Sequence, residues 1–105
     1  MLIEVNTDNN ITGSQELTEH VSEILNDRLG RFEDQITRLE LFLGDVNGKR
    51  EAGDDKRATL EARLKGTSPV VVTAIEGTIH QAVRSAADTM QLTLEKAMEK
   101  KRVQS

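Results

Sequence analysis

The sequence predicts an α+β domain with the element order β-α-β-β-β-α, in which two helices pack on one face of a four-stranded sheet. Two segments show apolar residues at helical spacing, and four others alternate apolar with polar residues or are rich in β-branched residues. Each amphipathic helix must bury its apolar stripe, and one face of the sheet can cover the stripes of both helices. With 105 residues, we expect a single domain spanning residues 1–105.

The first third of the chain predicts a short strand and then a helix. Leu2, Ile3 and Val5 lie between polar residues, and a turn signal follows at residues 9–10. Two helix starts compete, because Thr12 with Gln15 has the spacing of a capping box and Ser14 is an alternative cap. The apolar stripe of the helix comprises Leu17, Val21, Ile24, Leu25, Leu29 and Phe32.

The middle of the chain changes to a period of two, which is typical of half-buried strands. Residues 36–46 and residues 57–65 alternate in this way, and the polar residues 47–55 between them predict a long hairpin connection. The β-branched run at residues 70–75 predicts another strand, so three strands form an antiparallel meander. An antiparallel sheet tolerates a solvated face, and this face is expected to carry Arg38, Glu40, Phe42, Arg57, Glu61, Arg63 and Lys65.

A second helix is predicted from residue 79 onwards. Thr78 and Gln81 have capping-box spacing directly after the glycine that ends the last strand. The apolar stripe behind this cap comprises Ile79, Val83, Ala86, Ala87, Met90, Leu94 and Ala97.

The composition excludes several classes of function. The chain has no cysteine, which excludes disulfides, thiolate zinc sites and a cysteine nucleophile. It has no Trp or Tyr and only two Phe residues, so a pocket built on aromatic rings is not expected. No apolar run approaches the roughly 20 residues that a membrane span needs, and no signal peptide is visible. We therefore expect a cytoplasmic protein without membrane contact.

No motif in the sequence predicts catalysis. A phosphate loop, a dinucleotide fingerprint, a paired-histidine metal motif and a nucleophile elbow are all missing. An enzyme hypothesis rests only on His20 and His80, which would have to converge to form a metal or acid–base site. Single histidines on amphipathic helices are usually surface residues, so we expect no catalytic residue, no metal site and no cofactor.

The charges are unevenly distributed along the chain. Residues 1–55 contain 13 acidic and 5 basic residues, whereas residues 56–105 contain 5 acidic and 9 basic residues. Nucleic-acid phosphates could be contacted by the basic residues at the ends of both predicted helices, by Arg84, and by Arg57, Arg63 and Lys65 on or just after the third strand. The affinity of such contacts falls as salt rises. The alternative is structural, because bases at a helix C-terminus also stabilise the helix dipole.

The chain resembles the ribosome hibernation-promoting factor family, also called ribosomal subunit interface or sigma-factor modulation proteins, and is similar to its short form. The resemblance covers nearly the whole chain and depends on order and spacing rather than on one motif. It is carried by the opening strand at residues 2–5, by residues 20–32, by the pairing of residues 36–43 with residues 58–64, by residues 79–83, and by Ala87-Asp88. Residues 55–63 are similar to the third strand of the shorter members.

The resemblance implies a fold like that of a double-stranded-RNA-binding domain, and a function as a ribosome-associated translation inhibitor without catalytic activity. It implies binding of the small ribosomal subunit and ribosomal RNA where messenger and transfer RNA would sit, in response to stress. Carried over by position, the RNA-binding residues are Arg28, Arg31, Arg84, Lys96 and Lys100, and the patch is extended by Lys101 and Arg102.

The chain also departs from the family pattern. Thr89, Leu92 and Met98 stand where family members commonly carry bases, and the sequence pI is about 5.2. Because the sequence stops after the second predicted helix, we expect no C-terminal dimerisation domain of the kind found in the long members. The alternative function is therefore a protein-interaction module on the same fold, a homodimer or a regulator, with Leu92, Met98 and Phe42 as exposed contacts.

Overall fold

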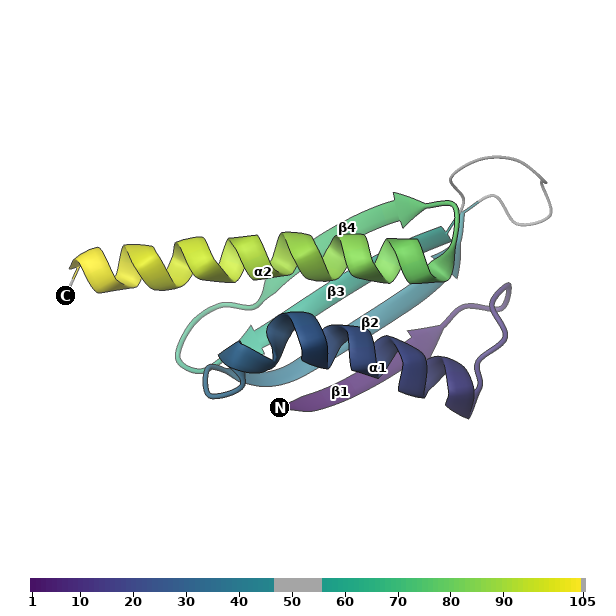
Figure 1. Cartoon of the computed structure of the whole chain (residues 1–105), viewed down its shortest axis with the longest axis horizontal. Coiled ribbons are helices and arrows are strands. Elements are labelled where there is room, and N and C mark those ends of the chain that lie inside the picture. The colour runs from purple at the N-terminus through teal and green to yellow at the C-terminus, as the bar shows by residue number, and fades with distance from the viewer. Residues whose placement is uncertain (47–55, 105) are drawn as a thin grey trace.

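A computed structural model describes residues 1–46 and 56–104, with side chains through Lys100, and confirms the predicted element order (Figure 1). The predicted connection at residues 47–55 lies outside the described residues, as do the side chains of Lys101 and Arg102. The elements are β1 (Leu2–Thr7), α1 (Gln15–Leu29), a short 3-10 helix η1 (Gly30–Phe32), β2 (Ile36–Asp45), β3 (Lys56–Leu64), β4 (Val70–Glu76) and α2 (Ile79–Gln104).

The four strands form one sheet in the order β1-β2-β3-β4. β1 is parallel to β2, and α1 makes the crossover that a parallel pair requires. β2, β3 and β4 form the predicted antiparallel meander, in which Leu41 lies opposite Leu60 and Leu60 opposite Val72. Both helices lie on the same face of this sheet (Figure 1), which confirms the predicted layers.

The core fills the space between the helices and the inner face of the sheet. β2 contributes Leu39 and Leu41, β3 contributes Leu60, and all three side chains are fully buried. The helices contribute the buried residues Val21, Leu25, Leu29, Ala82, Val83, Ala86, Ala87, Met90 and Leu94. The prediction that Ala97 belongs to the apolar stripe is wrong, since this residue is exposed. Ala97 instead lines a hollow beside the turn between β3 and β4. Figure 1 shows that α2 continues past the sheet at its C-terminal end.

The predicted solvated face of the sheet is also confirmed, except at Lys65. β3 ends at Leu64, and Gly66 has a φ of 70°, so the chain turns away before Lys65 can join the face. Lys65 lies in the turn between β3 and β4, where its backbone N–H donates to the carbonyl oxygen of Gln35 at 3.0 Å.

Side-chain caps start both helices. Of the two competing starts of α1, the structure selects Ser14, whose Oγ accepts from the backbone N–H of Leu17 at 3.0 Å. At α2 the predicted cap is confirmed, because Oγ1 of Thr78 accepts from the backbone N–H of Gln81 at 3.1 Å. Each cap satisfies one of the backbone donors that a helix start leaves without a partner.

Replacing Thr78 with Ala should lower the free energy of unfolding by about 1 kcal/mol, because the backbone N–H of Gln81 loses its acceptor. Urea denaturation followed by circular dichroism measures this loss. Thr18→Ala is the matched control, since Thr18 is exposed inside α1 and its hydroxyl caps nothing. Equal losses in the two variants would contradict the capping role.

Candidate nucleic-acid interface

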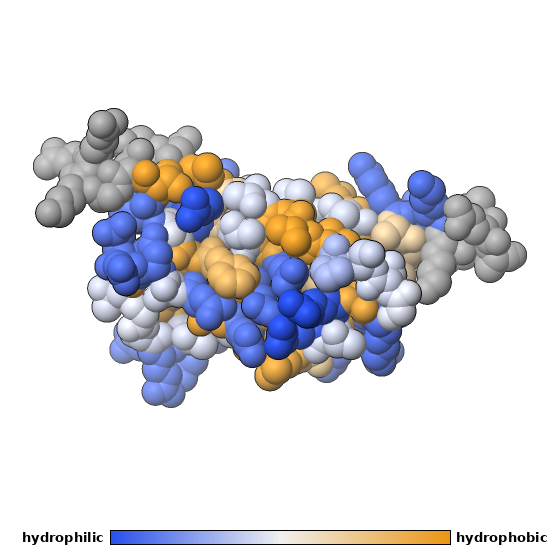
Figure 2. Space-filling view, turned by 180° about the vertical axis from the view of Figure 1, so that it is seen from behind, coloured by the Kyte–Doolittle hydropathy of each residue, from blue (hydrophilic) through white to orange (hydrophobic). Residues whose placement is uncertain are grey.

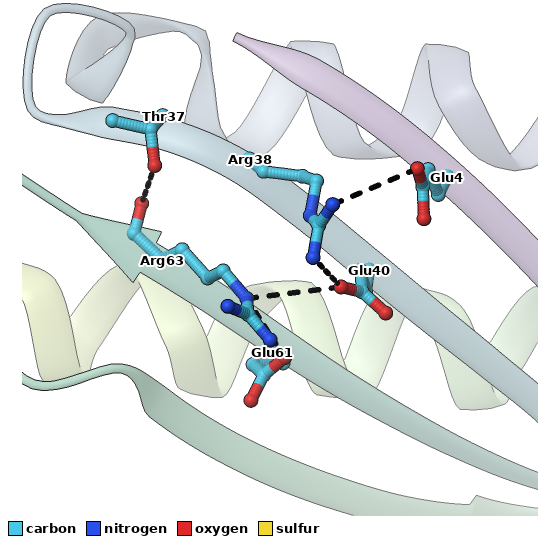
Figure 3. Close-up of polar contacts among 6 residues, drawn as sticks. All are labelled: Glu4, Thr37, Arg38, Glu40, Glu61 and Arg63. Carbon is cyan, nitrogen blue, oxygen red and sulfur yellow. Dashed lines mark hydrogen bonds and ion pairs between the residues drawn. The ribbon is translucent and has the colours of Figure 1, made fainter.

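The outer face of the sheet carries an ion-pair network across three strands (Figure 3). Arg38 on β2 lies between Glu4 on β1, at 3.8 Å, and Glu40 on its own strand. Nε of Arg63 on β3 lies 3.7 Å from Glu40 and 3.4 Å from Glu61. Three carboxylates thus face two guanidinium groups, and Glu40 contacts both of them.

This network makes the outer face unsuitable for a polyanion. Both arginines already have carboxylate partners, and the network has one more negative than positive group. Figure 2 shows this face as a hydrophilic area interrupted by apolar patches. The exposed apolar residues here are Leu2, Phe42, Val71 and Ile75. The described residues of the predicted RNA-binding set lie instead on the helical side of the molecule.

On the helical side, the two predicted RNA-binding arginines of the α1 region are paired with carboxylates. Nη1 of Arg28 lies 3.1 Å from Asp27, and Nε lies 2.9 Å from Oδ1 of Asp88 on α2. The Nε–H of Arg28 is buried without a well-directed hydrogen bond, so its contact with Asp88 is an ion pair of poor angle. Arg31 pairs with Glu95 on α2. The structure thus brings both arginines to α2, where acids neutralise them.

The other described members of the predicted set lie on α2 without such partners. Within residues 1–46 and 56–100, Arg84, Lys96 and Lys100 are exposed and form no ion pair. Arg84 lies in a shallow hollow with Glu76 and Asp88, and so its surroundings are mixed in charge. Lys96 and Lys100 stand one turn apart toward the C-terminal end of α2.

One further cation at this end of the molecule belongs to the bases that could contact phosphates but not to the RNA-binding residues implied by the resemblance. Lys65 is exposed and without an ion pair among the described residues, and it lines the same hollow as Lys100. The sequence carried one signal for this position, the Gly66-Thr67-Ser68-Pro69 turn that follows it. Three cations without described partners, Lys65, Lys96 and Lys100, therefore lie toward the C-terminal end of α2.

The two histidines converge, although each stands near the start of a different helix. Nε2 of His20 lies 2.9 Å from Nδ1 of His80, and the ring centroids are 5.0 Å apart. Both residues are exposed. Within the described part of the chain, no group of three or more His, Cys, Asp or Glu residues could hold a metal ion. The pair therefore joins the starts of α1 and α2 and does not by itself form a metal centre.

The fold defines an α+β class of protein, in which two helices cover one face of a four-stranded mixed sheet. A family model described as sigma 54 modulation protein / S30EA ribosomal protein matches residues 4–102. The chain belongs to this family of ribosome-associated factors, which are binding proteins and not enzymes. The resemblance seen in the sequence is thereby confirmed.

Two solved structures have a similar fold. The N-terminal domain of Protein Y from Thermus thermophilus is 22% identical, with a TM-score of 0.73 over 91% of this chain and 98% of that one. A ribosomal subunit interface protein from Coxiella burnetii is 17% identical, with a TM-score of 0.70 over 94% of this chain and 99% of that one. No curated protein matches the sequence. None of the described helices has an apolar stretch that could cross a membrane.

Proposed function

We propose that this protein, acting in the cytoplasm as one domain of residues 1–105, binds the small ribosomal subunit and keeps translation inactive. The mechanism is steric, because a folded domain that occupies the channel of messenger and transfer RNA excludes both. The observation that carries this proposal is the family match over residues 4–102. The bases that α2 leaves without described partners support it, since RNA is bound largely through phosphate contacts.

The proposed RNA contacts fall into two groups. Arg84, Lys96 and Lys100 are ready to meet phosphates, and Lys101 and Arg102 continue the same helix. Arg28 and Arg31 must first exchange a carboxylate of α2 for a phosphate. Side chains of Arg28 and Arg31 are 29% and 56% exposed, and ion pairs at such exposure are weak enough for this exchange.

Co-sedimentation with purified small ribosomal subunits over a salt series tests the proposed function. Binding should weaken steadily as salt rises, because each phosphate contact releases about 0.7–0.9 of a counterion. Large ribosomal subunits serve as the control for non-specific attraction to RNA. An absence of binding even at about 50 mM salt would end the proposal.

Replacing Glu95 with Gln should tighten binding to the small subunit by about 2- to 10-fold, since it frees one charge, Arg31, for a phosphate. The slope of log affinity against log salt should become steeper by about 0.7–0.9. Glu23→Gln is the matched control, because Glu23 is exposed on α1 and makes no ion pair among the described residues. The same gain in both variants would show that net charge, and not release of Arg31, sets the affinity.

A second candidate function is a protein-interaction module, a homodimer or a regulator, on the same fold. Its support is apolar exposure, because Leu92 on α2 is 57% exposed and Phe42 on β2 is 43% exposed. Met98 supports it less, since this residue is half-buried against the core. Light scattering over a range of protein concentrations tests the homodimer. A mass that stays monomeric at every concentration contradicts it.

A further inference from the structure

A hollow of about 510 Å³ lies beside the C-terminal end of α2. The turn between β3 and β4 forms one wall, α2 forms another, and the segment that leads into β2 closes a third side. The residues that matter for its chemistry are Lys65, Gly66, Thr67, Ser68, Met98 and Lys100. Its size lies within the range of small-molecule sites.

The charge of this hollow favours an anion. Lys65 and Lys100 come from different elements, and neither is in an ion pair with a described residue. Asp34 is the carboxylate among the lining residues, so the two lysines leave an excess of one positive charge. This differs from the seam between α1 and α2, where Asp88 and Glu95 balance the arginines.

The turn adds neutral donors to the two lysines. The φ of 70° at Gly66 reverses the chain tightly, and the bond from Lys65 to Gln35 fixes the start of the turn. The hydroxyls of Thr67 and Ser68 make no hydrogen bond to another described residue. Hydroxyls beside ammonium groups are a donor set that suits a phosphate group.

Apart from Gln35, the rest of the lining is apolar, and none of the lining residues is aromatic. Leu64, Val70 and Met98 are half-buried, and each offers aliphatic surface to the hollow. Such a wall accepts a ribose but offers no ring on which a base could stack. Lys96, one turn earlier on α2, gives a neighbouring phosphate a further cation. These features suit an RNA strand that continues beyond the hollow better than they suit a free nucleotide.

We propose that this hollow binds one phosphate of an RNA strand, held by Lys65 and Lys100 with the hydroxyls of the β3–β4 turn. The choice of RNA as the source of the phosphate rests on the function proposed above. The hollow itself is a separate claim, because it concerns Lys65 and the turn, which do not belong to the RNA-binding residues implied by the resemblance. The site therefore extends the RNA surface from α2 onto the sheet.

The experiment is an amide chemical-shift titration of the full chain with three probes: inorganic phosphate, uridine 5′-monophosphate, and a six-nucleotide single-stranded RNA. All three should shift the amide resonances of Gly66, Thr67 and Ser68 in a saturable way. The RNA should bind at least about 10-fold more tightly than the mononucleotide, because it meets Lys96 as well. Lys65→Gln and Lys100→Gln should each weaken RNA binding about 5-fold and reduce its salt slope by about 0.7.

Arg57→Gln is the matched control, because it removes one exposed cation without an ion pair to a described residue, at the opposite end of β3 from Lys65. It should leave the titration unchanged. Resonances of the turn that do not move, or that move equally in Lys65→Gln, would overturn the proposal. A mononucleotide that binds as tightly as the RNA would overturn the choice of RNA. If the chain fails to co-sediment with small subunits, the proposed function fails, while inorganic phosphate still tests the hollow.

Discussion

Replacing Lys96, Lys100 and Lys101 together with Glu should weaken binding to the small ribosomal subunit by about a thousandfold or more. Each substitution removes an attraction to phosphate and adds a repulsion. Lys96 and Lys100 are exposed and make no ion pair with a described residue, so the fold loses no contact there. Co-sedimentation at several salt concentrations measures the loss, and circular dichroism checks that α2 remains helical.

Two controls make this result interpretable. The corresponding triple glutamine variant should bind with intermediate affinity, because it removes the attraction without adding repulsion. Arg57→Glu reverses an exposed charge at the far end of β3 and should leave binding nearly unchanged. Unchanged binding of the triple glutamate variant would show that the contact surface lies elsewhere on the protein.

The cations without an ion pair are not all the ones that the sequence predicted as RNA contacts. The resemblance implies that Arg28 and Arg31 contact RNA, but Asp88 and Glu95 neutralise them where α1 packs against α2. The outer face of the sheet is likewise occupied by a network around Glu40. Of the described cations without an ion pair, Lys65, Lys96 and Lys100 gather at the C-terminal end of α2 and the adjoining turn, whereas Arg84 and Arg57 lie apart from them. A protein of pI about 5.2 can thus carry a local group of positive charges.

Local patterns were sufficient to predict the elements of the fold. The change of period marks β2 and β3, and the capping-box spacing at Thr78 and Gln81 places the start of α2. These signals act over a few residues, which is why they can be seen in one sequence. The sequence alone did not decide between Thr12 and Ser14 as the cap of α1, because the choice depends on the path of the preceding loop.

The candidate site was harder to predict, because its details depend on contacts between distant residues. Arg28 and Asp88, like His20 and His80, lie 60 residues apart and meet only because α1 and α2 start at the same end of the sheet. The alternation of apolar and polar residues continues through Lys65 and therefore predicts this residue on the sheet face. β3 ends one residue earlier, at Leu64. Periodicity shows which face a residue takes, and it does not show where the strand stops.

Leu25→Ala should produce the largest loss of stability among the predictions. Leu25 is fully buried in the middle of α1. The other buried residues of this helix, Val21 and Leu29, stand one turn before it and one turn after it. Removal of a buried leucine side chain costs the transfer free energy of the missing carbons plus the free energy of the cavity. We expect the free energy of unfolding to fall by about 3 kcal/mol, a large part of the 5–15 kcal/mol typical of such domains.

Urea denaturation of the two variants Leu25→Ala and Leu92→Ala measures this difference, with Leu92 as the matched control. Leu92 also lies on a helix but is 57% exposed, so its truncation opens no cavity and should change stability by less than about 0.5 kcal/mol. The result bears on function as well, because α1 holds Arg28 against Asp88 through the same packing. Equal losses of stability in the two variants would show that Leu25 does not anchor α1. The position of α1 that brings Arg28 to Asp88 would then need another cause.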